Sequence, residues 1–362
     1  MYNIYIKKVK EEKMGIKFEF LRAGCGDSIL VYTSNGTNIL IDGGEKKTYK
    51  KSIKPSLSRN EIDKLDLVVL THIDDDHISG LIEMLESTDG REMINEIWFN
   101  SYQDMKISNN LTNDVSFAEG DLFEDLINEY DITHRKNIFF TEESRQKDRE
   151  FYIGSDIKLT LLSPSKKELD KLQVSWDKFR DNEPKDVSGK SPFDSRDIDE
   201  IYADFQDKVL HKNDKSKTLL SATSTSTANG SSIAFLLEYQ DKKFLFLGDA
   251  DIKVINQSLI DLGMIGLEVN FVKLSHHGSK NNINKEFLDI VKTDTFVILT
   301  DGAKHQHPHK ETLSLILKHE KRAENIKFIF NYHQPIDYKF PREKNEEAFY
   351  SFEALYEREL EF

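Results

Sequence analysis

A buried-type strand, a polar loop and a helix follow one another between residues 65 and 85. The strand is the uninterrupted apolar run LDLVVL at 65–70, and such runs are typical of strands covered on both faces. From His77 to Leu85 the apolar residues recur every three or four positions, which predicts a helix with one buried face. Strands alternating with helices in this way predict an α/β fold.

The alternation continues on either side of a segment of different composition. Further strands are expected at 16–21, 28–32, 38–41, 233–238, 244–247, 271–274, 295–299 and 327–330, with helices from Asp251 and at 285–291. Residues 165–230 instead carry charged helical stretches, two prolines and the run SATSTSTANG, which predicts an insertion with a flexible tail. Residues 1–13 are expected to be a solvated extension, because Met14 offers a second start before the first core strand, and residues 14–362 to be the main domain.

Charge and cysteine content restrict the partners and the metal chemistry. The 64 acidic and 50 basic residues give a net charge of −14, opposite in sign to that of a general nucleic-acid binder. The single cysteine, Cys25, permits no internal disulfide and no cluster of cysteine ligands, so any metal is expected on histidine and carboxylate; this use of cysteine fits a reducing cytoplasm. No apolar run reaches the roughly 18 residues of a membrane span, so no membrane association is expected.

The decapeptide THIDDDHISG at 71–80 is the strongest sign of chemistry. Four possible ligands, His72, Asp74, Asp76 and His77, lie within six positions between the strand and the helix. Alternate residues of an extended loop point to the same side, so the first three can converge beside His77. Imidazole and carboxylate together suit zinc, manganese or iron. An aspartate that only caps the helix is the alternative, but capping does not account for two histidines.

Two later strands also end in residues of this kind. The run FLFLGDAD at 244–251 presents Asp249 at a strand end, where a carboxylate can either bridge two metals or cap the following helix. The segment LSHHGSKNN presents His276, His277 and Ser279 after another strand. Paired histidines at a strand end are seldom core residues, so both segments supply candidate site residues.

The order of these segments resembles the metallo-β-lactamase fold, and within it the hydrolase domain of ComEC-type DNA-uptake proteins. The resemblance rests on FLRAGCGDSILV (20–31), ILIDGG (39–44), THIDDDHISG, FLFLGDAD, LSHHGS and GAKHQHPH (302–309), and covers about residues 16–335 apart from the insertion. The wider fold has an HxHxDH motif, whereas the ComEC-like branch has HxDxDH, with Asp74 at the substituted position. The resemblance implies a four-layer αββα sandwich in a stand-alone, soluble form.

The resemblance also implies a set of metal ligands. His72 and Asp74 would face one metal position, and Asp76, His77 and His276 the other. Asp249 would bridge them, with one or two ions of Zn²⁺ or Mn²⁺ per chain. The third histidine motif of the fold is absent, and Asn229 in NGSS at 229–232 stands there instead, which weakens the first position.

Other matching residues would support the ligands or contact the substrate. Asp42 would hold the metal-binding loop by hydrogen bonds, and His277 would contact the substrate. His307, with His305 beside it in the late motif, would bind negative charge or protonate the leaving group; a solvated, helix-capping turn is the alternative. Asp27 in GCGDS is expected to be only a glycine-assisted turn.

The implied chemistry is hydrolysis by a metal-activated hydroxide, with Asp76 or Asp249 orienting the water. A phosphodiester in nucleic acid or a nucleotide is the expected substrate, which makes the chain a phosphodiesterase or nuclease. Lys46 and Lys47 belong to EKKTYKKSIK at 45–54, with five lysines in ten residues, and would attract phosphate, although a solvated loop is the alternative. Two other functions stay open: a hydrolase of a small ester, lactone or phosphate ester, and a non-catalytic scaffold that binds a protein partner through the 165–230 insertion.

Overall fold

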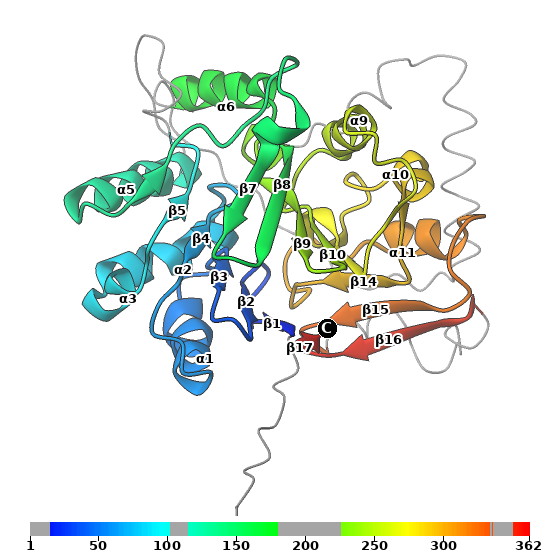
Figure 1. Ribbon diagram of the computed structural model, residues 1–362, viewed down its shortest axis with the longest axis horizontal. Coiled ribbons are helices and arrows are strands. Elements are labelled where there is room, and N and C mark those ends of the chain that lie inside the picture. Colours follow the sequence, from blue (N-terminus) through cyan, green and yellow to red (C-terminus); the bar gives the residue numbers. More distant parts are fainter. Residues whose placement is uncertain (1–14, 102–114, 180–225, 334, 336–349) are drawn as a thin grey trace, which may run out of the picture.

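Two β-sheets packed face to face form the centre of the protein, as the computed structural model shows (Figure 1). The structure describes residues 15–101, 115–179, 226–333, 335 and 350–362. The predicted extension at 1–13, and residues 180–225 of the predicted insertion, lie outside these ranges. The domain boundaries therefore remain predictions.

The first sheet has seven strands within the described ranges, in the order β17-β1-β2-β3-β4-β5-β6. The strands are β1 (Ile16–Phe20), β2 (Ile29–Thr33), β3 (Asn38–Ile41), β4 (Leu67–Val69), β5 (Ile97–Trp98), β6 (His134–Arg135) and β17 (Glu359–Glu361). Strands β1 to β3 form an antiparallel meander, whereas β3 to β6 run parallel. The chain therefore leaves β3 and β4 at the same edge of the sheet.

The second sheet, counted over the same ranges, has eight strands in the order β16-β15-β14-β12-β10-β9-β8-β7. They are β7 (Glu150–Ile153), β8 (Ile157–Ser163), β9 (Ala234–Tyr239), β10 (Lys242–Phe246), β12 (Phe271–Lys273), β14 (Thr295–Ile298), β15 (Ile326–Phe330) and β16 (Phe352–Tyr356). Strands β10, β12, β14, β15 and β16 of this sheet run parallel to one another. The short strands β11 (Leu267–Glu268) and β13 (Val291–Lys292) pair separately.

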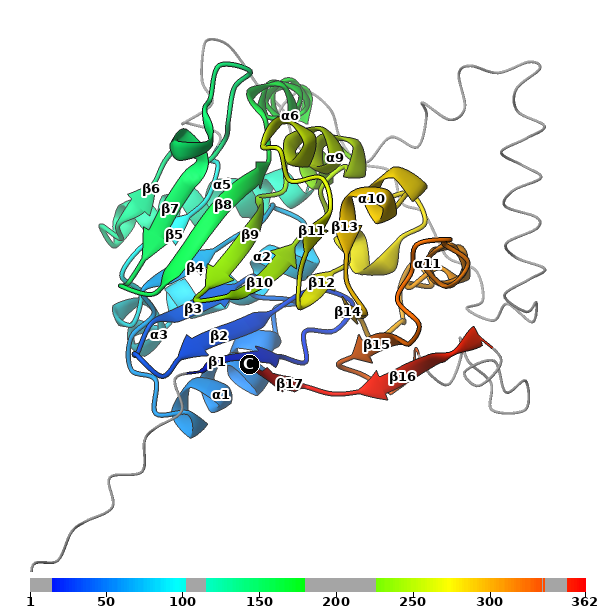
Figure 2. The same ribbon diagram turned by 45° about the vertical axis from the view of Figure 1, so that its right-hand side comes forward.

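Helices cover the outer face of each sheet (Figures 1 and 2). The first sheet carries η1 (Tyr49–Ile53), α1 (Lys54–Arg59), α2 (Asp75–Glu86), α3 (Thr88–Glu92), α5 (Val115–Glu129), α6 (Lys166–Phe179) and α8 (Thr227–Gly230). The second carries α9 (Ile252–Asp261), α10 (Lys285–Ile290) and α11 (Lys310–Leu317). The short 3-10 helices η2 (Gln146–Arg149) and η4 (Ser275–Gly278) lie in connections. This is the four-layer αββα sandwich that the resemblance implies.

An aromatic core joins the two sheets. Phe18 of the first sheet lies 4.5 Å from Phe244 and 5.0 Å from Phe271 of the second, measured between ring centroids. Phe362 follows β17 and lies 4.9 Å from Phe244. Because β16 belongs to one sheet and β17 to the other, the last strands tie the two sheets together.

Helix α6 lies within the predicted insertion and packs against the main core. Trp176 is fully buried, and its ring lies 5.0 Å from that of Phe117 in α5. The charged residues of α6 occupy the opposite side of the helix, so the segment reads as hydrophilic in the sequence although one face is apolar. In the described part of the chain, no helix combines the length and apolar character needed to cross a bilayer.

Candidate metal centre

The candidate residues lie where parallel strands end. Asp42 follows β3, and the loop with His72 follows β4; Asp249 follows β10, and His276 follows β12. Gly248 has a φ of 49°, and a Cβ atom there would lie 3.3 Å from Cβ of Thr71. The ends of the two sheets therefore meet closely, at the kind of edge where α/β folds place their ligands.

Asp42 holds both the loop and one histidine. Its Oδ1 accepts a hydrogen bond from the Thr71 backbone N–H at 2.7 Å, and its Oδ2 lies 2.8 Å from Nδ1 of His77. With Nδ1 donating to Asp42, the ring presents Nε2 to the centre of the site. Burial alone would lower the pKa of His77, but the charges of Asp42 and Asp249 raise it well above its ordinary value.

Asp249 is the carboxylate on which the histidines converge. Its Oδ1 lies 3.7 Å from Nε2 of His77, and its Oδ2 lies 3.8 Å from Nε2 of His72. The Nε2 atoms of His276 and His277 lie 3.7 Å and 3.9 Å from Oδ2. Two donors bound at about 2.1 Å to one tetrahedral ion are about 3.4 Å apart, so these separations match a metal-binding cluster.

Several donor atoms of this cluster are buried without a hydrogen-bond partner. They are Nε2 of His72, His77 and His277, and Oδ1 of Asp249. Buried polar atoms are normally paired, so this set fits a bound cation. Burial, followed by the charge of His77, lowers the pKa of His72 to about 3, which leaves the imidazole neutral and able to bind a metal.

Asp74 and Asp76 come from the start of α2. Asp74 precedes the helix, and its Oδ2 lies 3.7 Å from Nε2 of His72. Asp76 Oδ2 lies 3.7 Å from Nε2 of His277. Burial and the charges of Asp76 and Asp249 raise the pKa of Asp74 to about 7, because uncompensated carboxylates repel one another. The cluster is thus rich in negative charge that a divalent ion would neutralise.

His276 and His277 both adopt left-handed backbone conformations, with φ values of 49° and 54°. Such conformations are costly for residues other than glycine and gather at functional sites. Nδ1 of His277 donates to the Leu299 carbonyl at 2.9 Å, so its Nε2 also faces the cluster. The resemblance assigned His276 to a metal position and His277 to the substrate, whereas both side chains approach Asp249 here.

A buried ion pair contacts the Nδ1 side of His277, away from the metal cluster. Lys273 and Asp27 form this pair, and Asp27 Oδ1 lies 3.2 Å from Nδ1 of His277. Asp27 was expected to serve only a turn, and Lys273 was not singled out at all. The signal for Lys273 was a lone charge inside the apolar strand segment FVKL, which is rare unless the charge is paired.

The other predicted residues lie at different places around the cluster. Asn229 Nδ2 donates to Asp249 Oδ2 at 3.2 Å, so the residue at the missing histidine motif contacts the Asp249 carboxylate. The buried ring of His307 lies 4.9 Å from that of His276, and the exposed His305 lies 5.9 Å from His307. Ser279 is buried, and its backbone N–H donates to the His276 carbonyl.

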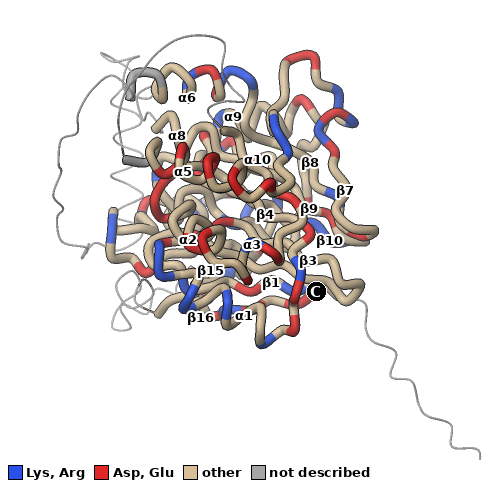
Figure 3. The backbone as a smooth tube through the Cα atoms, turned by 90° about the vertical axis from the view of Figure 1, so that its left-hand side faces the viewer, with Lys and Arg blue, Asp and Glu red and all other residues tan. Residues whose placement is uncertain are grey.

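The lysine-rich segment is largely neutralised by acidic neighbours. Nζ of Lys46 and of Lys50 lie 3.4 Å and 2.6 Å from the carboxylate of Glu83, and Lys54 pairs with Asp89. Lys47 is exposed. Figure 3 shows acidic and basic stretches interspersed over the described elements of this face, around α2, α3 and α5. The segment therefore has less net positive charge than its lysine count indicates.

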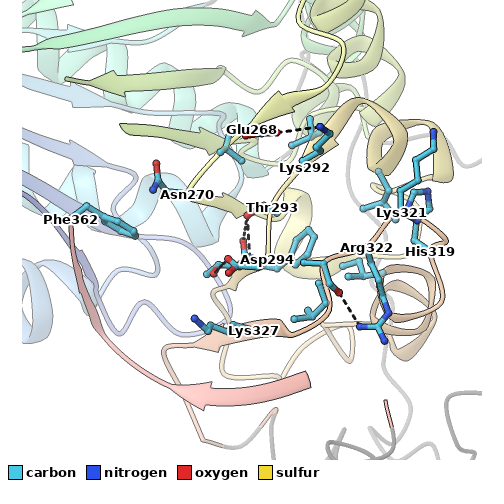
Figure 4. A pocket seen from close by; sticks show the side chains of 18 residues that line it. Glu268, Asn270, Lys292, Thr293, Asp294, His319, Lys321, Arg322, Lys327 and Phe362 are labelled. Atoms are coloured by element: carbon cyan, nitrogen blue, oxygen red, sulfur yellow. Dashed lines mark hydrogen bonds and ion pairs between the residues drawn. The ribbon is translucent and has the colours of Figure 1, made fainter. Parts of the chain in front are cut away.

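A separate cavity of about 590 Å³ lies at the opposite ends of β12, β14 and β15 (Figure 4). Lys292 pairs there with Glu268 at 3.2 Å. Arg322 donates to the Tyr350 carbonyl at 3.1 Å. The residues that line this cavity include none of the candidate metal ligands.

Comparisons with known proteins match one part of the chain to the metallo-beta-lactamase superfamily. Residues 22–104, which include the HxDxDH loop, match the family model of the metallo-beta-lactamase superfamily. ComE operon protein 3 of Bacillus subtilis (strain 168) is 26% identical over 103 residues, which are 28% of this chain and 13% of that protein. The chain thus matches a small part of that relative.

Solved structures of low sequence identity resemble the chain over most of its length. The metallo-beta-lactamase fold protein YhfI from Bacillus subtilis is 10% identical, with 97% of this chain and 100% of that chain covered and a TM-score of 0.41. Zn²⁺-bound PqqB from Methylobacterium extorquens is 10% identical, with 96% and 99% covered and a TM-score of 0.41.

Proposed function

Because the chain contains a metallo-β-lactamase superfamily domain, matched over residues 22–104, we propose that it is a metal-dependent hydrolase of phosphodiesters in nucleic acid or nucleotides. The observation that carries the proposal is the position of Asp249. One of its oxygens faces His77 and the other faces His72, His276 and His277. A carboxylate used from both sides is suited to bridge two ions, the arrangement that serves hydrolysis of phosphate esters.

The ligands would come from both sheets. His72, His77 and Asp249 offer three donor atoms that lie within 4.8 Å of one another, and Asp74 lies beside them. Asp76 and His277, whose side chains lie 3.7 Å apart, would hold a second ion, and Asp249 would be shared between the two positions. Zn²⁺ or Mn²⁺ bound there supplies Lewis acidity and lowers the pKa of water.

The remaining residues would position the substrate. Burial, followed by the charges of His277 and His276, lowers the pKa of His307. A neutral His307 would donate a hydrogen bond to a substrate oxygen through one N–H, and this favours binding over protonation of the leaving group. The exposed Lys47 would add attraction for phosphate, and the exposed His305, whose ring lies 5.9 Å from that of His307, would add a hydrogen bond to the substrate. We also propose a cytoplasmic location, which the single cysteine of the chain supports.

The experiment is a substrate panel with a matched pair of variants. Protein loaded with zinc or manganese is incubated with single-stranded DNA, RNA, a cyclic dinucleotide, a bis-aryl phosphodiester and a lactone. We expect cleavage of phosphodiesters, and Asp249→Asn should lower the rate at least about 100-fold, since even outer-shell changes cost about 10- to 100-fold. Asp251→Asn is the control, because Asp251 only caps α9 by accepting from Lys253 N–H at 2.9 Å, and asparagine caps equally well.

The alternatives give different results in the same panel. Turnover of the lactone without cleavage of any phosphodiester would replace the proposal with a small-ester hydrolase. A metal-loaded protein that turns over none of the substrates, and keeps its biological effect as Asp249→Asn, would be a scaffold.

A further inference from the structure

We infer that a surface beside the metal centre, formed by Arg22, Tyr332, His333 and Tyr356, binds the bases and phosphates of single-stranded nucleic acid. These four residues are the stacking surface. The inference rests on the proposed function and narrows its substrate to a single strand, whose bases are free to stack on protein rings.

The stacking surface lies at the edge of the sheets that carries the metal centre. Arg22 follows β1, and Tyr332 and His333 follow β15. Strand β16 runs parallel beside β15 (Figures 1 and 2) and pairs Tyr356 with Phe330, the last residue of β15. Strand β1 runs in the same direction as β3, and β15 in the same direction as β10 and β12. All of these strands therefore end on the side of the candidate ligands.

Backbone hydrogen bonds join the stacking surface to the metal centre. Tyr332 Oη accepts from the Gly24 N–H at 2.9 Å. The next residue is Cys25, whose Sγ lies 3.4 Å from Asp76 Oδ2. The Gly24 carbonyl accepts from the Asp301 N–H at 2.9 Å, which fixes the loop before α11 at the same place. A strand bound on the stacking surface would therefore continue into the metal centre.

The stacking surface combines aromatic rings with a positive charge. Arg22 Cζ lies 5.5 Å from the centre of the Tyr332 ring, and Nη2 of Arg22 donates to Tyr356 Oη at 3.1 Å. The rings of His333 and Tyr356 are stacked, with centroids 3.9 Å apart and planes at 28°. Arg22 and His333 are exposed, and the two tyrosines are half-buried. Aromatic rings and guanidinium planes are the groups on which proteins stack unpaired bases.

The charge of Arg22 is available to a phosphate. Within the described ranges, its side chain contacts a phenol and an aromatic ring, and no carboxylate lies within ion-pair distance. Two carboxylates near Tyr332 have partners of their own. Glu45 pairs with Lys304 at 3.7 Å, and Asp301 Oδ1 accepts from the Ala303 N–H at 2.8 Å. On a chain with a net charge of −14, such an arginine beside stacked rings matches a phosphate that carries a base.

Binding of labelled oligothymidine tests the inference. Zinc-loaded full-length protein is titrated with a cleavage-resistant phosphorothioate strand of about 12 nucleotides, with a duplex of the same length and with an abasic strand, and fluorescence anisotropy is recorded. We expect the single strand to bind at least about tenfold more tightly than the other two. His333→Ala should weaken binding of the single strand about tenfold and leave the abasic strand unchanged. Arg22→Gln should reduce the slope of log affinity against log salt by about 0.7.

Two matched variants far from the stacking surface are the controls. Tyr152→Ala removes a ring that is 71% exposed on β7. Arg135→Gln removes an arginine of β6 that pairs with Glu96 and is 46% exposed. Strands β7 and β6 lie at the opposite ends of the two sheets from β16 and β17, so neither control should change the binding of any strand.

The outcomes separate this inference from the proposed function. Equal binding of the single strand and the abasic strand, or His333→Ala and Arg22→Gln variants that behave like the controls, would overturn the inference, while cleavage of phosphodiesters would leave the proposed function standing. A wild type that binds the single strand as expected but cleaves no phosphodiester would overturn the proposed function alone. The comparison of the three strands uses the wild type, so it decides the matter even if a variant does not fold.

Discussion

Replacing Asp27 by asparagine should strongly destabilise the metal-free protein, because it leaves a buried ammonium group without its counter-charge. The side chains of Lys273 and Asp27 are 1% and 3% exposed. Removing one partner of a buried ion pair costs about 3–5 kcal/mol, whereas replacing both partners by neutral groups is often close to neutral. We therefore expect Asp27→Asn to lose about 3–5 kcal/mol, and Asp27→Asn combined with Lys273→Met to regain most of it.

Urea unfolding measures these free energies. Trp98 and Trp176 are fully buried, so their fluorescence reports the loss of the core on both sides of the first sheet. Asp170→Asn is the control, because Asp170 pairs with Lys166 at the surface, with side chains 55% and 48% exposed. Such pairs contribute about 1 kcal/mol or less.

The same pair has a defined pH dependence. Burial alone would raise the pKa of Asp27, but the charges of Lys273 and His277 lower it below its ordinary value. A lowered folded-state pKa stabilises the protein above the unfolded value of about 3.9, and the stabilisation is lost as the pH falls further. A loss in Asp27→Asn as small as that of Asp170→Asn, or an equal loss in the double variant, would refute the reasoning.

Three further predictions concern the site and the core. Burial and neighbouring carboxylates raise the pKa of Asp74 to about 7, and a metal ion must displace the proton of this carboxyl group. Zinc affinity, measured by calorimetry, should therefore fall as the pH drops below about 7. An affinity that does not change between pH 8 and pH 6 would contradict this. Asp42→Asn should weaken zinc binding about 10- to 100-fold through the lost support of His77, whereas Asp66→Asn, on the loop before β4, should not. Phe244→Ala should cost about 3–5 kcal/mol in urea unfolding, since its ring packs between Phe18 and Phe362; a loss below about 1 kcal/mol would disprove that packing.

Much of the fold could be predicted because its strands are short, apolar and followed by distinctive residues. The strand expected at 38–41 is β3, and the helix expected at 285–291 is α10 (Lys285–Ile290). Helix α6 could not be assigned to the core from the sequence, because its hydrophilic residues outnumber the three buried apolar ones, Leu169, Leu172 and Trp176. The pairing of β16 and β17 with different sheets depends on long-range contacts that no local pattern records.

In the site, too, some residues could be predicted from the local sequence and others only from contacts between the two sheets. His72 and Asp249 could be singled out because imidazole and carboxylate at strand ends are costly to bury without a purpose. The roles of Asp27 and Lys273 could not, because a turn aspartate and a strand lysine acquire meaning only when the two sheets bring them together. Which of His276 and His277 faces the cluster depends on the left-handed backbone conformation of both residues. Two adjacent histidines in a sequence do not indicate this conformation.

Anomalous X-ray diffraction from crystals soaked in Zn²⁺ tests the central claim most directly. The account predicts anomalous density beside the Asp249 carboxylate, within bonding distance of Nε2 of His72 or His77, and its loss in Asp249→Asn. Crystals of the wild type that bind zinc elsewhere, or that leave this cluster without density at saturating zinc, would contradict it.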